Sequence, residues 1–145
     1  MARQVAIEID AALPADWEGV VALWEAVGLT RPWNDARADF DLALAGPAST
    51  ILLAREGAAL RGTVMVGFDG HRGWVYYLGV DPACRDAGIG RALMQASEQW
   101  LTARGCPKIQ LMVRGSNAEA RGFYEALGYD VQDVVTIGRR LDGRG

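Results

Sequence analysis

Two glycines and two arginines lie close together in the middle of the chain, between Arg85 and Arg91. Gly88 and Gly90 leave the backbone unobstructed, so that its N–H groups can approach a ligand closely. Each arginine adds a guanidinium group, which pairs with phosphate oxygens through parallel hydrogen bonds. This combination of residue types predicts a loop that binds a phosphate or pyrophosphate.

A strand before this loop and a helix after it must position these groups. The apolar run that ends at Val80 predicts a buried strand, which Pro82 prevents from continuing. Apolar residues then recur at helical spacing from Ile89 to Leu101, so the loop forms the N-terminus of a helix. The helix macrodipole disfavours a cation such as Arg91 at that end, and a bound phosphate would reverse this preference.

Two other phosphate-binding motifs fit the sequence poorly. A P-loop requires Gly-Lys followed by Ser or Thr, which occurs nowhere in the chain. A dinucleotide fingerprint requires a small residue where Leu93 stands, and the next apolar run ends at Arg114 instead of an acid. A nucleotide-binding protein is a weaker alternative, which binding of ATP or NAD at micromolar levels would support.

Arg85, Gly88 and Gly90 match the R-x-x-G-x-G/A motif, and the stretch resembles that of the Gcn5-related N-acetyltransferases (GNAT). A second segment is similar to the family's N-x-x-A-x-x-[FL]-Y-x-x-x-G-[FY] pattern. Its matching residues are Asn117, Ala120, Phe123, Tyr124, Gly128 and Tyr129. The resemblance implies that Asn117 contacts the pantetheine arm of acetyl-CoA and that Tyr124 protonates the departing thiolate.

The resemblance also implies the fold and the cofactor contacts. It implies an α/β (α+β) acyl-CoA N-acyltransferase fold in one domain, residues 1–145, with a mixed, mostly antiparallel sheet and about four helices on both faces. Acetyl-CoA would lie where the strands before Asp81 and before Arg114 diverge. The residues expected to contact it are Leu78, Gly79, Val80, Arg85, Asp86, Ala87, Gly88, Ile89, Gly90, Arg91, Asn117 and Tyr124.

Transfer of an acetyl group from a thioester to an amine requires a neutral amine and stabilisation of an oxyanion. Backbone N–H groups around Leu78 to Val80 are candidates for the oxyanion site, and neither cysteine is needed as a nucleophile. The candidates for the general base are Tyr77, His71, Asp35 and a water chain to strand carbonyls. Met112 stands where ribosomal-protein N-terminal acetyltransferases carry a glutamate, which argues against peptide N-termini as acceptors.

A closer resemblance is to the bacterial YpeA-type acetyltransferases. It depends on the strings L-W-E, R-P-W-N-D, G-T-V-M, D-G-H-R-G, Y-Y-L-G-V and A-R-G-C-P-K-I-Q, between Leu23 and Gln110. This subgroup implies the cofactor and leaves the acceptor open. Polar and aromatic residues in turns that the core does not require form the expected acceptor side: Trp33, Asn34, Asp35, His71 and Tyr77.

Composition excludes several other classes of protein. With 145 residues and a net charge of −3, the chain fits one globular domain without broad nucleic-acid binding. No signal peptide or membrane-spanning run is present, so a cytoplasmic location is expected. Two cysteines and one histidine cannot supply a convincing metal site.

The remaining elements follow from periodicity and from glycine and proline positions. Helices are expected at 15–27, 35–44, 90–104 and 117–128, and strands at 5–9, 50–55, 63–68, 74–80, 109–113 and 131–141. Strict alternation in the 74–80 strand would place Val75, Tyr77 and Gly79 on one face and Tyr76 on the other. An exposed apolar final strand leaves a homodimer open. A non-catalytic acyl-CoA sensor is the rival function, which would not need Tyr124.

Overall fold

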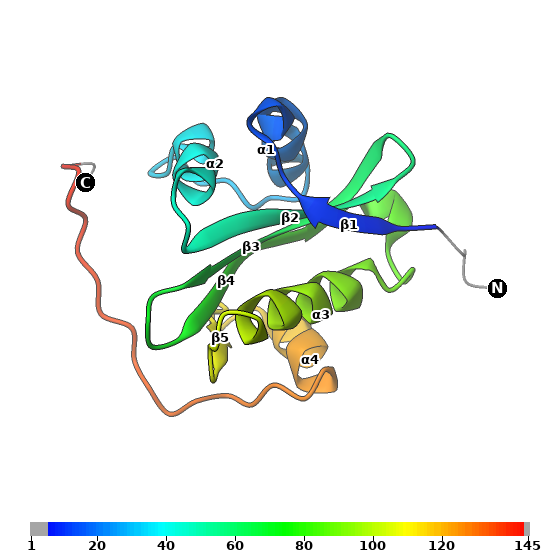
Figure 1. Cartoon of the computed structure of the whole chain (residues 1–145). Helices are drawn as coiled ribbons and strands as arrows, with labels where there is room; N and C mark the ends of the chain where they lie inside the picture. Colours follow the sequence, from blue (N-terminus) through cyan, green and yellow to red (C-terminus); the bar gives the residue numbers. More distant parts are fainter. Residues whose placement is uncertain (1–5, 144–145) are drawn as a thin grey trace. The chain divides into compact units, whose positions relative to one another are not determined.

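The chain divides into two compact units, Met1–Leu111 and Met112–Gly145, of which the computed structural model describes residues 6–143. The first unit is built on a five-stranded sheet with the strand order β1-β2-β3-β4-β5 (Figure 1). Three neighbouring pairs are antiparallel, and β4 and β5 are parallel. The strands are β1 (Glu8–Ala11), β2 (Ser49–Glu56), β3 (Ala59–Phe68), β4 (Gly73–Val80) and β5 (Ile109–Leu111).

Helices cover both faces of this sheet. The helices α1 (Trp17–Ala26) and α2 (Ala36–Ala45) lie on one face, and α3 (Ile89–Thr102) lies on the other (Figure 1). Short 3-10 turns precede α1 and follow β4, at Pro14–Asp16 and Pro82–Cys84. The expected mixed, mostly antiparallel sheet with helices on both faces is confirmed.

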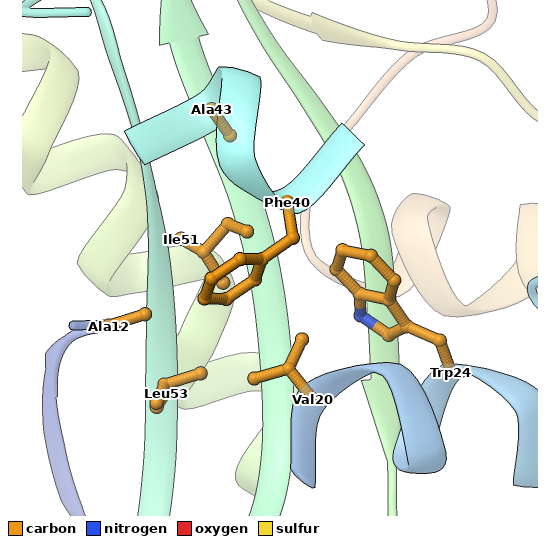
Figure 2. Packing of buried hydrophobic residues seen from close by; sticks show 7 residues of the cluster. All are labelled: Ala12, Val20, Trp24, Phe40, Ala43, Ile51 and Leu53. Carbon is orange, nitrogen blue, oxygen red and sulfur yellow. The ribbon is translucent and has the colours of Figure 1, made fainter. Parts of the chain in front are cut away.

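The core under α1 and α2 consists of aromatic and branched side chains without exposed surface. Phe40 from α2 packs over Ile51 and Leu53 of β2, and Trp24 from α1 belongs to the same buried cluster (Figure 2). Full burial of one such side chain is worth about 1.5–3 kcal/mol. This cluster fixes α1 and α2 on the sheet, and Trp24 places its indole beside the middle of β4.

On the opposite face, glycines let α3 approach the sheet closely. A Cβ atom at Gly62 would lie 2.9 Å from the side chains of Ile89 and Leu93, and one at Gly73 would lie 2.4 Å from Leu101. Ile89 is buried at the first turn of α3. The start of α3 is therefore held firmly against β3, which positions the loop that precedes it.

The second unit contains one helix, α4 (Ala118–Ala126), among its described residues. Asn117 caps it, because its side-chain oxygen accepts a hydrogen bond of 3.0 Å from the Ala120 N–H. The helix ends before Gly128, whose φ of +93° is a left-handed conformation that glycine adopts readily. Both predicted boundaries of this helix are confirmed.

The prediction of a final strand over 131–141 is wrong. This segment forms no strand, and its apolar side chains are exposed, among them Val135 at 85% and Ile137 at 92%. An apolar pattern alone does not make a strand, because the backbone N–H and C=O groups also need a partner strand. Within the described residues, this segment has none.

Other boundaries differ by a few residues. The third predicted strand begins at Ala59 instead of Thr63, because only Gly57 and Ala58 form the turn after β2. Val5, expected in the first strand, lies outside the described residues. Among the described residues, no helix has both the length and the apolar content that spanning a bilayer requires.

Candidate active site

The loop between β4 and α3 has the geometry expected of an anion-binding loop. Asp86 and Gly88 both adopt left-handed conformations, with φ of +65° and +79°, and turn the chain into the helix. The backbone N–H groups of Arg85 and Ala87 donate to carbonyls of the preceding turn, at 3.4 Å each. The N–H groups that remain for a ligand are therefore concentrated at the start of α3.

Within the described part of the chain, no side chain caps the start of α3. Gly88 occupies the cap position, and the first hydrogen bond within the helix runs from Ala92 N–H to the Gly88 carbonyl, at 3.0 Å. The first four N–H groups of a helix have no acceptor within it, and here they belong to Gly88, Ile89, Gly90 and Arg91. The positive end of the helix macrodipole adds to their attraction for an anion. The arginine side chains at 85 and 91 are exposed beside them.

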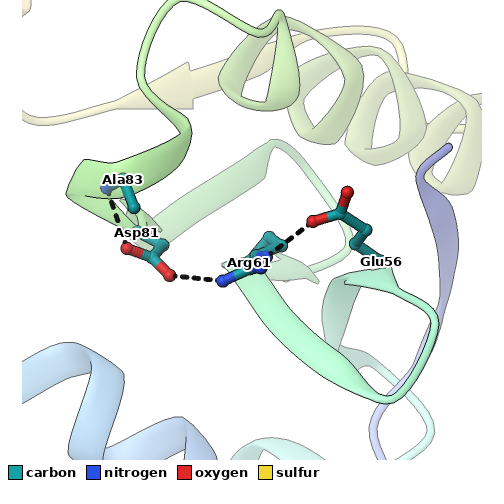
Figure 3. A network of polar contacts seen from close by, with 4 residues as sticks. All are labelled: Glu56, Arg61, Asp81 and Ala83. Atoms are coloured by element: carbon teal, nitrogen blue, oxygen red, sulfur yellow. Dashed lines mark hydrogen bonds and ion pairs between the residues drawn. The ribbon is translucent and has the colours of Figure 1, made fainter. Parts of the chain in front are cut away.

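An ion-pair network holds the beginning of the loop (Figure 3). Arg61 from β3 donates to Asp81 at 3.0 Å and to Glu56 at 3.0 Å. Asp81 also accepts a hydrogen bond of 2.9 Å from the Ala83 N–H, which fixes the 3-10 turn after β4. These contacts tie the exit of β4 to the β2–β3 hairpin.

A β-bulge interrupts β4 four residues before the loop. The sheet register passes from Met65↔Tyr76 to Thr63↔Gly79, so that β4 has one more residue than β3 over this interval. Tyr77 is at the bulge and has a φ of +54°, which is uncommon for a residue other than glycine. Such a conformation costs about 1–3 kcal/mol and persists only where surrounding contacts impose it.

Because of the bulge, the side chains of β4 lie on other faces of the sheet than strict alternation predicts. A Cβ atom at Gly73 would meet Leu101 of α3, which places Gly73 and its alternate neighbour Val75 on the α3 face. Tyr77 instead stacks on Trp24 of α1, with ring centroids 3.9 Å apart. Tyr76 pairs with Met65, which packs against the α1–α2 core, so both tyrosines lie on that face. Alternation alone predicted one tyrosine on each face.

Tyr77 is a hydrogen-bond donor at this position. Its hydroxyl donates to the Asp39 carboxylate of α2 at 2.6 Å. Burial, together with this carboxylate, raises the pKa of Tyr77 well above its ordinary value. The phenol therefore stays protonated at neutral pH, and this geometry does not favour Tyr77 as the general base.

The edge of β4 that faces β5 is open beyond the bulge. The parallel ladder ends at the pair Val75↔Leu111, so Tyr76 to Val80 have no strand partner on that side among the described residues. Cofactor contacts were predicted at Leu78, Gly79 and Val80, which all lie in this open stretch. A pantetheine arm can pair with such an edge as an added strand does.

The expected acceptor-side residues separate into two places. Trp33 is 46% exposed in the turn before α2, and Asn34 donates its backbone N–H to the Arg31 carbonyl at 3.0 Å. Asp35 caps α2 by accepting from the Ala38 N–H at 3.0 Å. His71 is exposed in the turn before β4, at the opposite end of this strand from the loop. The structure therefore does not bring His71 to the loop.

Tyr124 lies in the middle of α4 in the second unit. Its ring makes edge contacts with Phe123 and Tyr129, at centroid distances of 5.0 Å and 5.9 Å. Burial raises the pKa of Tyr124 to about 12. The hydroxyl is therefore protonated at neutral pH, as a proton donor must be.

Comparisons with known proteins show the family of this chain. Residues 17–129 match the model of the "Acetyltransferase (GNAT) family". The chain belongs to the GNAT acetyltransferase family. It is also 48% identical over 126 residues to "Acetyltransferase ECA0875" of Pectobacterium atrosepticum, a match that covers 87% of this chain and 89% of that protein. The chain is accordingly an acetyltransferase.

Two solved structures show the same fold. One is the aminoglycoside acetyltransferase AAC(6')-Iy with the bisubstrate analogue CoA-S-monomethyl-acetylneamine. Its TM-score is 0.81 at 17% identity, over 93% of this chain and 98% of that one. The other is a predicted acetyltransferase from Clostridium acetobutylicum with acetyl-CoA, with a TM-score of 0.78 at 16% identity, over 97% of this chain and 100% of that one.

Sequence reasoning missed two residues of this acetyltransferase that contact the bulge. Asp39 is separated from Tyr77 by 38 positions, and its place on α2 gave no sign of the contact. Thr63 was expected only as a strand residue, yet its hydroxyl bonds to the Tyr77 carbonyl. Among the described residues, no group of three or more His, Cys, Asp or Glu side chains could hold a metal ion.

Proposed function

We propose that this acetyltransferase uses acetyl-CoA as its cosubstrate and transfers the acetyl group directly to a primary amine. The observation that carries the proposal is the uncapped start of α3, with two arginines beside it, directly after a strand with an open edge. CoA offers a pyrophosphate for the first feature and an amide-containing pantetheine arm for the second. The GNAT structures with CoA and acetyl-CoA support the same cofactor.

The loop residues bind the pyrophosphate. The N–H groups of Gly88 to Arg91 donate to its oxygens, and the guanidinium groups of Arg85 and Arg91 neutralise its charge. Asp86 and Ala87 shape the turn through their backbone. Leu78, Gly79 and Val80 pair with the pantetheine arm through the open edge of β4.

Asn117 and Tyr124 act on the pantetheine arm and on the thioester sulfur of the same acetyl-CoA molecule. The cap of α4 uses the side-chain oxygen of Asn117, and the NH2 group of the same amide can donate to a pantetheine carbonyl. Tyr124 donates its proton to the departing sulfur. We therefore also propose that residues 1–145 act as one catalytic domain.

The reaction is a direct transfer without a covalent enzyme intermediate. The neutral amine nitrogen attacks the thioester carbon, and the carbonyl oxygen becomes an oxyanion that accepts a hydrogen bond from the Leu78 N–H. As the C–N bond forms and the C–S bond breaks, CoA leaves as a thiolate and takes the Tyr124 proton. The proton lost by the amine leaves through water along the carbonyls of β4, and its return to Tyr124 completes the cycle.

The acceptor is recognised by the turn before α2. Trp33 presents an exposed indole, and the polar groups of Asn34 and Asp35 follow it. An aromatic face beside carboxylate and amide oxygens suits an amine with a neighbouring apolar part. This set and the string matches between Leu23 and Gln110 support placement among the YpeA-type acetyltransferases. If Trp33→Ala leaves the acceptor KM unchanged, Trp33 leaves this set.

The test is acetyl-CoA binding followed by turnover on one sample of the full chain. Calorimetry measures the binding, and thiol release is followed against simple amines, polyamines, amino acids, aminoglycosides and peptides. Binding with acceptor-dependent thiol release supports the proposal. Binding without release across the panel favours an acyl-CoA sensor, and the absence of binding contradicts the cofactor assignment.

A further inference from the structure

Two polar side chains are fully buried among the described residues, and they differ in what they contact. The Ser97 hydroxyl donates to the Leu93 carbonyl in its own helix, at 2.9 Å, which is a local bond. The Thr63 hydroxyl accepts from Trp24 Nε1–H at 2.9 Å and donates to the Tyr77 carbonyl at 2.9 Å. Thr63 therefore links α1, β3 and the bulge of β4.

Thr63 is one of three restraints on Tyr77. The hydroxyl of Thr63 holds the backbone carbonyl, Trp24 stacks on the ring at an interplanar angle of 12°, and Asp39 accepts from the phenol. Together they hold a residue with a φ of +54° that an unrestrained chain seldom adopts. Of the three, only Thr63 fixes the orientation of the peptide group itself.

That peptide group joins Tyr77 to Leu78, and it is trans. In a trans peptide the C=O and N–H bonds point in opposite directions. Because the Tyr77 carbonyl points at Thr63, the Leu78 N–H points away from Thr63. The β4–β5 ladder has already ended at Val75, so this N–H belongs to the open stretch of the strand.

We propose that Thr63 is a positioning residue for acetyl transfer. With its hydroxyl oriented by the Trp24 indole, Thr63 holds the Tyr77–Leu78 peptide so that the Leu78 N–H donates to the acetyl carbonyl oxygen. This inference rests on the proposed function, since it assumes acetyl-CoA in the site. The hydroxyl forms and breaks no covalent bond; it keeps the oxyanion donor in place before the charge develops.

The experiment compares Thr63→Val with Thr63→Ser and with Ser97→Ala in the full chain. Valine removes the hydroxyl and nearly keeps the shape, while serine keeps the hydroxyl. Ser97→Ala removes the other buried hydroxyl at a distance from the bulge. Should Thr63→Val fail to fold, Trp24→Phe takes its place, because it removes the indole N–H and retains an aromatic ring against Tyr77.

The first readout is the amide resonance of Leu78 in protein labelled with 15N-leucine, titrated with acetyl-CoA and with CoA. CoA lacks the acetyl carbonyl, so the wild type should show a Leu78 displacement with acetyl-CoA that CoA does not produce. We expect Thr63→Val to lose this difference, and Thr63→Ser and Ser97→Ala to keep it. A difference that persists in Thr63→Val, or is absent from the wild type although acetyl-CoA binds, overturns the inference.

The second readout is turnover with an active acceptor. We expect kcat to fall about 10- to 100-fold in Thr63→Val, with little change in the KM for acetyl-CoA, and to recover in Thr63→Ser. An equal loss in Ser97→Ala would mean that the variants act through general stability, and would contradict the inference. If the wild type does not bind acetyl-CoA, the proposed function itself fails, which is a separate result from either of these.

Discussion

The starts of α2 and α3 meet the same physical requirement in opposite ways. Each helix begins with four backbone N–H groups that have no acceptor within the helix. At α2, the Asp35 carboxylate accepts one of these hydrogen bonds, from Ala38. At α3, Gly88 is at the cap position and no side chain among residues 6–143 caps the helix. The first turn of α3 also carries Arg91, which opposes the macrodipole.

The difference separates a helix start that is completed by its own side chain from one whose N–H groups remain for the proposed pyrophosphate. A side-chain cap is worth about 1 kcal/mol, so its absence at α3, together with an unfavourable arginine, is a cost to the free protein. Under the proposed function, acetyl-CoA offsets that cost when it binds. The start of α4 resembles that of α2, because Asn117 caps it, and the proposed proton donor, Tyr124, lies in the helix interior.

The largest expected effect concerns Tyr124 in α4, where a substitution should slow acetyl transfer without weakening acetyl-CoA binding. Tyr124→Phe should lower kcat about 100- to 10,000-fold and leave the acetyl-CoA Kd nearly unchanged, because it removes the proton donor and keeps the aromatic ring. A thiol-release assay measures kcat, and calorimetry measures the acetyl-CoA Kd. Tyr129→Phe, which removes a neighbouring hydroxyl, is the matched control and should keep wild-type kcat.

The pH dependence of kcat provides a related test. Since the Tyr124 pKa is raised to about 12, the protonated acid is present at all lower pH values and is lost only as the pH rises through that value. The kcat profile should rise with pH as the acceptor amine loses its proton, and should not fall again below about pH 10, the ordinary tyrosine pKa. A falling limb between pH 7 and 9 that Tyr124→Phe abolishes would contradict this assignment.

Charge reversal at the open helix start should move stability and binding in opposite directions. Arg91→Glu should raise the acetyl-CoA Kd about 10- to 100-fold through lost charge-assisted hydrogen bonds. The same change should stabilise the free protein by about 0.3–1 kcal/mol, because an acid suits a helix N-terminus. Arg37→Glu makes the same charge change in the first turn of α2 and should leave the Kd unchanged. If Arg91→Glu binds acetyl-CoA normally, the pyrophosphate is elsewhere.

Substitution of Gly88 tests whether the left-handed backbone at the start of α3 is needed for cofactor binding. Gly88→Ala places a side chain at a φ of +79°, which costs about 1–2 kcal/mol, although nothing lies within 4 Å of the new Cβ atom. We expect a lower unfolding free energy and an acetyl-CoA Kd raised about 10-fold, measured by denaturant unfolding and calorimetry. Gly122→Ala, in the interior of α4 with equal space, should instead stabilise by about 0.5–1 kcal/mol.

The smallest effect belongs to the capped helix. Asp35→Ala should reduce the unfolding free energy by about 1 kcal/mol and leave the acetyl-CoA Kd unchanged, because it removes only the α2 cap. Asp35→Asn retains an accepting oxygen and should recover most of the stability. A weakened acetyl-CoA Kd in Asp35→Ala would mean that the two helix starts do not differ in the way described here.

Features set by local sequence could be predicted. The boundaries of the helices predicted at 15–27, 35–44 and 117–128, and the glycine loop before α3, each depend on residues a few positions apart. The family motifs add a resemblance to this local information. The parallel pairing of β4 and β5 is of the same kind, because strand, helix and strand in succession imply a parallel pair.

Features set by contacts between distant residues could not be predicted. The bulge at Tyr77 is stabilised by contacts with Thr63, Trp24 and Asp39. These residues lie between 14 and 53 positions from Tyr77 in the sequence. Alternation in the sequence is the same with or without a bulge, so the two tyrosines were placed on opposite faces. The prediction of a strand over 131–141 was wrong for a related reason, since an apolar pattern in the sequence does not supply a partner strand.

Pyrophosphate binding at the start of α3 is tested most directly by the affinity of the full chain for acetyl-CoA relative to acetyl-pantetheine, measured by calorimetry. Acetyl-pantetheine keeps the thioester and the arm and lacks the phosphates. If the start of α3 binds the pyrophosphate, acetyl-CoA should bind at least about 100-fold more tightly, the equivalent of about 2.8 kcal/mol. Equal affinities would contradict pyrophosphate binding at this site, because the start of α3 would then contribute nothing to cofactor binding.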